Sequence, residues 1–113
     1  MKEIYGKMTT SHKEKTCFDQ WRAGEKFSVI AKNLRVAEAT TEVYTIDMVC
    51  EGYATPTERR RLLRDMGVDD NKFKEILGHL EKGVVLLREI KDATTFRYNQ
   101  IRAVIGYLIQ ESN

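Results

Sequence analysis

The chain has 113 residues, of which 42% are hydrophobic and 32% charged, and its formal net charge at pH 7 is +2. That length suffices for one compact domain with its own core. With so small a net charge, the overall charge of the protein by itself gives no reason to expect a polyanionic partner. No stretch approaches the ~20 apolar residues of a membrane span, and the first residues lack the apolar run of a secretory signal.

The helix-breaking residues and the cysteines give further information on the fold class and the cellular location. One proline and seven glycines leave few interruptions, so an all-α fold is expected. Cys17 and Cys50 fall inside apolar helical patterns and are predicted to be small buried residues rather than halves of a disulfide. Reduced cysteines favour an intracellular protein, in the nucleus of a eukaryote or the cytoplasm of a bacterium. Residues 1–10 are expected to be a flexible lead-in to one helical domain over 11–110.

Three helices are predicted in the half that covers residues 11–52, with the spacing of a helix-turn-helix unit. The first begins at a capping box, in which the Ser11 hydroxyl and the Glu14 carboxylate satisfy free amides, and it ends at Gly24. Apolar periodicity places the others, a second helix over 27–34, a connection over 35–37 and a third helix over 38–51. Such a unit can place its third helix in a nucleic-acid groove.

The third helix has a predicted apolar stripe made of Ala39, Val43, Ile46 and Cys50, with Val49 beside it. The side chains left for solvent or a ligand are polar: Glu38, Thr40, Thr41, Glu42, Tyr44 and Thr45. Hydroxyl groups can hydrogen-bond phosphates or base edges. A solvated helix face is the alternative, because this stretch carries more carboxylates than cations, whereas a DNA-reading helix is usually basic.

The half that covers residues 55–110 is also predicted to be helical and packed beside the first. A fourth helix opens at Thr55-Pro56, and Asp69 or Asp70 caps a fifth. Residues 84–90 fit either a short buried strand or a short helix. A last helix is predicted from about Tyr98 to Gln110.

Four arginines in six residues form the densest positive patch of the chain, at positions 59, 60, 61 and 64. Arg60 and Arg64 lie four apart on a helix and project together, with Arg61 adjacent to both. This pattern predicts a phosphate-binding patch. A solvated face with internal salt bridges to Glu58 and Asp65 is the alternative.

Catalytic patterns are lacking in the sequence. His12 and His79 are the two histidines, and neither has the neighbouring ligands of a zinc site. The glycines are spread singly and form no phosphate-cradling loop. We therefore expect no enzyme activity, cofactor or metal.

The order of the segments resembles the helix-turn-helix module near the C-terminus of RecQ-type helicases, Werner-type proteins among them. The matching pieces are Phe27–Ala31, Thr40–Glu42 followed by Gly52, Leu87–Asp92 and Tyr98–Val104. The chain departs from the family at Arg35, where a glycine is frequent, and at Ala37 and Ala39, where a serine is usual.

The resemblance implies a non-catalytic nucleic-acid-binding accessory module, with DNA the expected ligand, that belongs to or partners a helicase or repair protein. Thr40, Thr41, Tyr44 and Thr45 would approach bases or phosphates, and phosphate would be held by Lys32, Arg35, Arg60, Arg61 and Arg64. The acidic third helix favours the alternative, a protein–protein interaction module that keeps the fold without binding nucleic acid. A transcription regulator is a third hypothesis and predicts a two-fold dimer with recognition helices ~34 Å apart.

Overall fold

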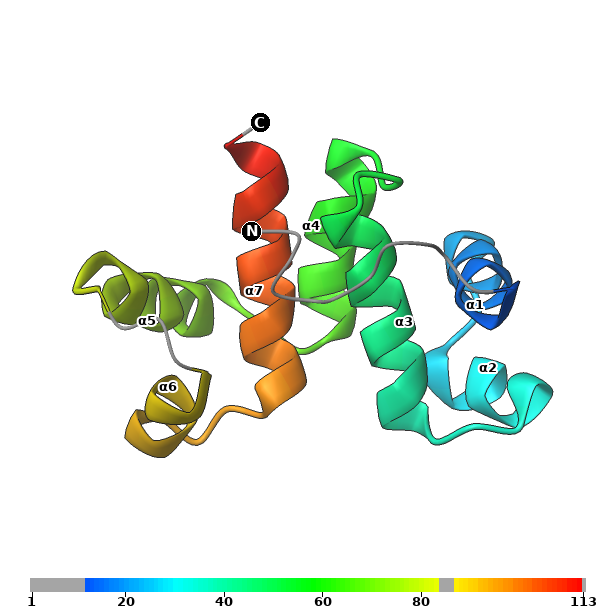
Figure 1. Ribbon diagram of the computed structural model, residues 1–113, viewed down its shortest axis with the longest axis horizontal. Helices are drawn as coiled ribbons and strands as arrows, with labels where there is room; N and C mark the ends of the chain where they lie inside the picture. Colours follow the sequence, from blue (N-terminus) through cyan, green and yellow to red (C-terminus); the bar gives the residue numbers. More distant parts are fainter. Residues whose placement is uncertain (1–11, 84–86, 113) are drawn as a thin grey trace.

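Seven helices make up the described part of this computed structural model, residues 12–83 and 87–112 (Figure 1). In chain order they are α1 (His12–Arg22), α2 (Phe27–Leu34), α3 (Glu38–Cys50), α4 (Pro56–Asp65), α5 (Asp70–Glu81), α6 (Leu87–Ala93) and α7 (Tyr98–Glu111). Those residues contain no strand, which confirms the all-α prediction. The predicted lead-in and the Ser11 end of the capping box lie outside the described residues.

Helices α3 and α7 pack against each other in the middle of the molecule (Figure 1). Helices α1 and α2 cover α3, whereas α4, α5 and α6 pack on α7. Each of the seven helices contributes at least one buried apolar side chain to the core. The third helix of the helix-turn-helix unit is thus an inner helix with neighbours on two sides.

A glycine on α7 allows the two central helices to approach closely. A Cβ atom at Gly106 would lie 3.0 Å from the Sγ atom of Cys50 on α3. That separation is shorter than van der Waals contact, so a larger residue would require the Cys50 side chain or the helices to shift. Cys50 and Cys17 are both buried and free of a disulfide, as predicted.

Local signals placed most helix ends correctly. Thr55 caps α4, where its hydroxyl accepts from the Glu58 amide at 3.1 Å and the Glu58 carboxylate accepts from the Thr55 amide at 2.8 Å. Asp69 caps α5 by accepting from the Lys72 amide at 2.8 Å. The ambiguous segment is helical from Leu87 onward, and its first residues at 84–86 lie outside the described ranges.

The turn between α2 and α3 depends on an arginine in a left-handed conformation. Arg35 has φ 57° and ψ 48°, the one positive φ of a non-glycine residue in the described ranges. The bend lets the Val36 amide reach the Ala31 carbonyl at 3.1 Å, which satisfies the end of α2. The family that the chain resembles often has glycine here, and glycine adopts this conformation without a Cβ clash.

Replacing Arg35 by glycine should therefore stabilise the protein. The left-handed conformation costs a non-glycine residue ~1 kcal/mol, and the extra freedom of glycine in the unfolded chain offsets part of the gain. We expect the free energy of unfolding in urea to rise by about 0.5 kcal/mol. Arg35→Ala is the control, since it removes the same side chain without relieving the backbone. Equal stability of the two variants would contradict this explanation.

Candidate functional site

Two of the predicted contact residues on α3 lie inside the protein. Thr41 and Thr45 are both 0% exposed. The Thr41 hydroxyl donates to the Glu38 carbonyl at 2.6 Å, and the Thr45 hydroxyl donates to the Thr41 carbonyl at 2.9 Å. Their predicted contact with nucleic acid is wrong for this structure, because α1 covers the face from which they project: Cys17 Sγ lies 3.4 Å from the Thr41 carbonyl oxygen and 3.7 Å from the Thr45 hydroxyl.

The buried side of α3 is rotated relative to the predicted stripe. Ala39 is exposed and Val43 only partly buried, whereas Glu42 is buried. The Glu42 carboxylate accepts from both terminal nitrogens of Arg97, at 3.0 and 3.3 Å, and from Asn99 Nδ2 at 2.8 Å. The start of α7 thus neutralises an acidic residue that the sequence had placed on the surface.

The part of α3 that reaches solvent is short and carries no cation. Its accessible side chains are Glu38, Ala39, Thr40, Val43 and Tyr44, the last three only partly, together with Glu51 at the C-terminal end. Phosphate contacts supply much of the affinity of a groove-reading helix. This surface therefore offers little to the backbone of a duplex.

Arg61 ties α4 to α1 and is not free to hold phosphate. Its Nη2 donates to the Trp21 carbonyl at 2.6 Å, and its Nε lies 3.2 Å from Asp65 Oδ2. The guanidinium carbon lies 4.4 Å from the centre of the Trp21 ring, within the range of a cation–π contact. The predicted role of Arg61 in phosphate binding is corrected to a structural one.

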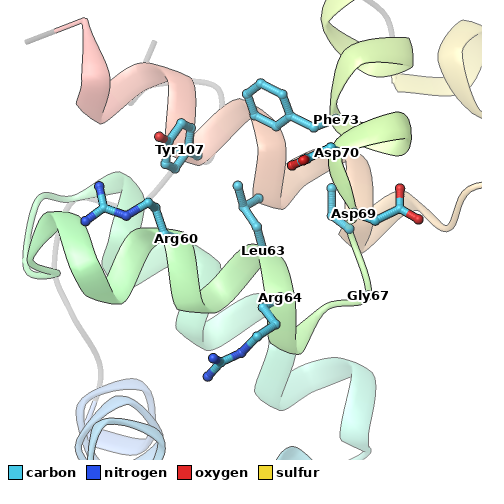
Figure 2. A pocket seen from close by; sticks show the side chains of 9 residues that line it. Arg60, Leu63, Arg64, Gly67, Asp69, Asp70, Phe73 and Tyr107 are labelled. Atoms are coloured by element: carbon cyan, nitrogen blue, oxygen red, sulfur yellow. The ribbon is translucent and has the colours of Figure 1, made fainter.

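The remaining predicted cations are accessible but not gathered into one patch with α3. Lys32 and Arg35 are exposed at the end of α2, and Arg60 and Arg64 are exposed on α4. Arg64 is the freest of them, with 77% of its side chain exposed and Asp65 Oδ1 3.7 Å away. Arg60 and Arg64 both line a cleft at α4, and their side chains leave the helix in different directions (Figure 2).

This cleft lies between α4, the start of α5 and α7, and has a volume of about 500 Å³ (Figure 2). Its walls are apolar: Leu63 from α4 points toward Phe73 of α5 and Tyr107 of α7 (Figure 2). The two aromatic rings meet edge to face, with centroids 5.7 Å apart. Pockets of this size and lining are typical of ligand and peptide sites.

Opposite charges border the two sides of the cleft. Arg60 and Arg64 come from α4, and Asp69 and Asp70 come from the first turn of α5 (Figure 2). Gly67, with φ +75°, lies in the short turn that connects α4 to α5 and lines the cleft. The sequence predicted that Asp69 or Asp70 caps this helix, and Asp69 does so, but it gave no sign that Asp70 lies on the side of the cleft opposite the arginines.

Hydrogen bonds fix the α7 wall of the cleft. Burial raises the pKa of the Tyr107 hydroxyl, and its hydrogen bond to the Glu111 carboxylate raises this pKa further. Glu111 also accepts from Arg59 Nη2 at 2.9 Å, and these hydrogen bonds from Arg59 and Tyr107 lower the pKa of Glu111. At neutral pH Tyr107 is thus a protonated donor held in place beside the apolar wall.

A second candidate surface, which the sequence analysis missed, surrounds Tyr98 at the start of α7. Tyr98 is 39% exposed. Lys91 Nζ lies 5.9 Å and the Arg102 guanidinium carbon 5.8 Å from the centre of its ring. Arg97 precedes it, with 54% of its side chain exposed. The available signal was Arg97-Tyr98 followed by a cation four residues later on a predicted helix.

Comparisons with models of protein families, with curated proteins and with solved structures found no match for this chain. The resemblance to the RecQ-type module therefore stays a prediction. Within the described ranges, no group of three or more histidine, cysteine or acidic side chains could hold a metal ion. None of the helices described is both long and apolar enough to cross a membrane.

Proposed function

We propose that this chain is a non-catalytic protein-interaction module that receives a segment of a partner protein in the cleft between α4, α5 and α7. The single observation that supports this proposal is the combination of apolar walls with arginines on one side and aspartates on the other. Phosphates would be attracted by Arg60 and repelled by Asp70, whereas a polypeptide can present both signs of charge together with apolar side chains.

The apolar surface of α5 extends beyond the cleft and favours a polypeptide over a small molecule. Of the four large apolar and aromatic side chains on this helix, Ile76 is fully buried. Phe73, Leu77 and Leu80, spaced i, i+4 and i+7, keep part of their surface accessible. A partner segment that fills the cleft would cover this strip as well, as in helix-in-groove recognition.

A random peptide library displayed on phage tests the proposal. Peptides selected on the protein should lose at least about tenfold in affinity for Phe73→Ala, because an aromatic wall residue contributes strongly to such interfaces. Lys74→Ala, an exposed neighbour on α5, is the matched control and should bind as the wild type does. Selected peptides that bind Phe73→Ala unchanged would show that this cleft is not the interaction site.

Nucleic-acid binding is kept as a second proposal, favoured by the cations around Tyr98. Two phosphate contacts by Lys91 and Arg102 would make the affinity for a labelled single strand fall about sevenfold between ~50 and ~200 mM salt. Tyr98→Ala should weaken binding further if a base stacks on the ring. Arg88→Ala, on an 84% exposed side chain, is the control. A salt-independent signal, or none at low salt, would remove this proposal.

A further inference from the structure

The cleft between α4, α5 and α7 has a charge direction. Arg60 and Arg64 are carried by the last two turns of α4, and Asp70 by the first turn of α5, with Leu63, Phe73 and Tyr107 between them (Figure 2). From α4 to α5, the surface of the cleft therefore changes from positively charged to apolar and then to negatively charged. A partner that fits must carry the reverse order on its own surface.

We infer that the partner segment is an amphipathic helix with carboxylates on the flank that faces α4, apolar side chains in its centre and lysine or arginine on the flank that faces α5. This inference rests on the proposed function and names the chemistry of its partner. Three observations carry it.

The first observation is that the Arg64 guanidinium is available to carboxylates, and that Arg60, which already interacts with Tyr107 and Glu111, adds a second positive charge on the same helix. Arg64 is largely exposed, and the nearest carboxylate oxygen, of Asp65, lies at 3.7 Å, beyond a direct hydrogen bond. Asp65 instead accepts a hydrogen bond from Trp21 Nε1 at 3.0 Å. Arg60 lies beside the Tyr107 hydroxyl at the edge of the apolar wall (Figure 2). Two guanidinium groups one helical turn apart match carboxylates one turn apart on a partner helix.

The second observation is the shape of the apolar part. A cleft of about 500 Å³ holds a few side chains and not a whole helix. The accessible strip along α5 continues the apolar surface for two further turns, through Leu77 and Leu80. A helix that inserts one row of apolar residues and lies along α5 uses both features.

The third observation is that Asp70 and Asp69 differ in their tasks. Asp69 accepts from the Lys72 amide and so caps α5. Asp70 is exposed, and in Figure 2 its carboxylate lies on the cleft side of α5. It can therefore pair with a partner cation, and replacing it leaves the helix cap intact.

Charge exchange with synthetic peptides tests the direction. The probe is an alanine-based peptide of about 15 residues, with leucines at i, i+3 and i+4 spacing, glutamates on one flank and lysines on the other. A second probe carries lysine on both flanks. We expect Arg60→Glu together with Arg64→Glu to weaken binding of the first probe about tenfold and to strengthen binding of the second by a similar factor. Asp70→Lys should weaken binding of the first probe and leave the cap of α5 in place.

Two controls separate charge direction from net charge and from folding. Lys74→Glu together with Lys82→Glu changes the net charge equally at exposed positions of α5 and its end, and should leave both affinities within about twofold. Arg64→Glu alone tests the inference if the double variant fails to fold, since Arg64 is 77% exposed.

The outcomes are distinguishable. Probe binding that requires Phe73 but ignores the exchange of charges overturns the charge direction and leaves the proposed function standing. Failure of both probes and of the peptide library overturns the two together. Concentration-dependent dimers in sedimentation that vanish with Arg60→Glu would assign the cleft to a second copy of this chain and overturn the inference. Displacement of a bound probe by an oligonucleotide would overturn it in favour of nucleic acid.

Discussion

Trp21→Ala is expected to lower the free energy of unfolding by ~3–5 kcal/mol, the usual range for truncating a buried tryptophan. Trp21 is 1% exposed. Its ring stacks on the Phe18 ring with centroids 5.9 Å apart, and the Arg61 guanidinium carbon lies 4.4 Å from the centre of the Trp21 ring. Its Nε1 donates to Asp65 at 3.0 Å. The truncation removes the core contact and the two contacts that the Trp21 side chain makes with α4.

Unfolding of this variant is to be followed by circular dichroism, because Trp21 is the only tryptophan of the chain. Trp21→Phe is the matched control. It keeps most of the apolar surface and loses the hydrogen bond to Asp65, so a loss of about 1–2 kcal/mol is expected. If Trp21→Ala lowered the free energy of unfolding by less than Trp21→Phe does, the placement of this ring in the core would be contradicted.

Arg97→Met is expected to destabilise the protein by about 2–3 kcal/mol, because it leaves the buried Glu42 carboxylate without its cation. The side chain of Glu42 is 8% exposed and that of Arg97 54%. The half-exposed guanidinium and the remaining hydrogen bond from Asn99 Nδ2 keep the loss below the ~3–5 kcal/mol of a fully buried pair.

A double variant and an exposed pair make this prediction specific. Adding Glu42→Leu to Arg97→Met should recover most of the lost free energy of unfolding, since an apolar pair needs no charge compensation. Arg88→Met removes an ion pair at 4.0 Å between side chains 84% and 73% exposed, and should change stability by under ~0.5 kcal/mol. Urea unfolding of the four proteins measures all of these values. Equal losses at Arg97 and Arg88 would contradict the buried pair.

The burial of α3 changes the functional hypothesis as well as the stability. A groove-reading unit needs an accessible third helix with cations near its start. Here α7 packs along that helix and Arg97 binds its Glu42, and the accessible remainder carries no cation. Helices α4 and α5 both pack on α7 and line the cleft, which favours the alternative of a protein-interaction module.

Local chemistry in the sequence determined the helices of this protein. The turns at Gly24, Gly52, Gly67 and Gly83 all have positive φ, and the caps at Thr55 and Asp69 form as predicted. Such signals act within a few residues and do not need the rest of the fold. The all-α class and the burial of both cysteines followed from the same patterns.

Only the tertiary structure decided which faces are buried and which arginines are free. The partners Glu42 and Arg97 are 55 residues apart, and Arg61 and the Trp21 carbonyl are 40 apart. Periodicity had given α3 a stripe through Ala39 and Val43, because polar residues such as Thr41 and Glu42 count as exposed until a distant group supplies their hydrogen bonds. The cleft is lined by α4 and α5, which one turn connects, and by α7, which follows much later in the chain, so no single stretch of sequence contains its pattern.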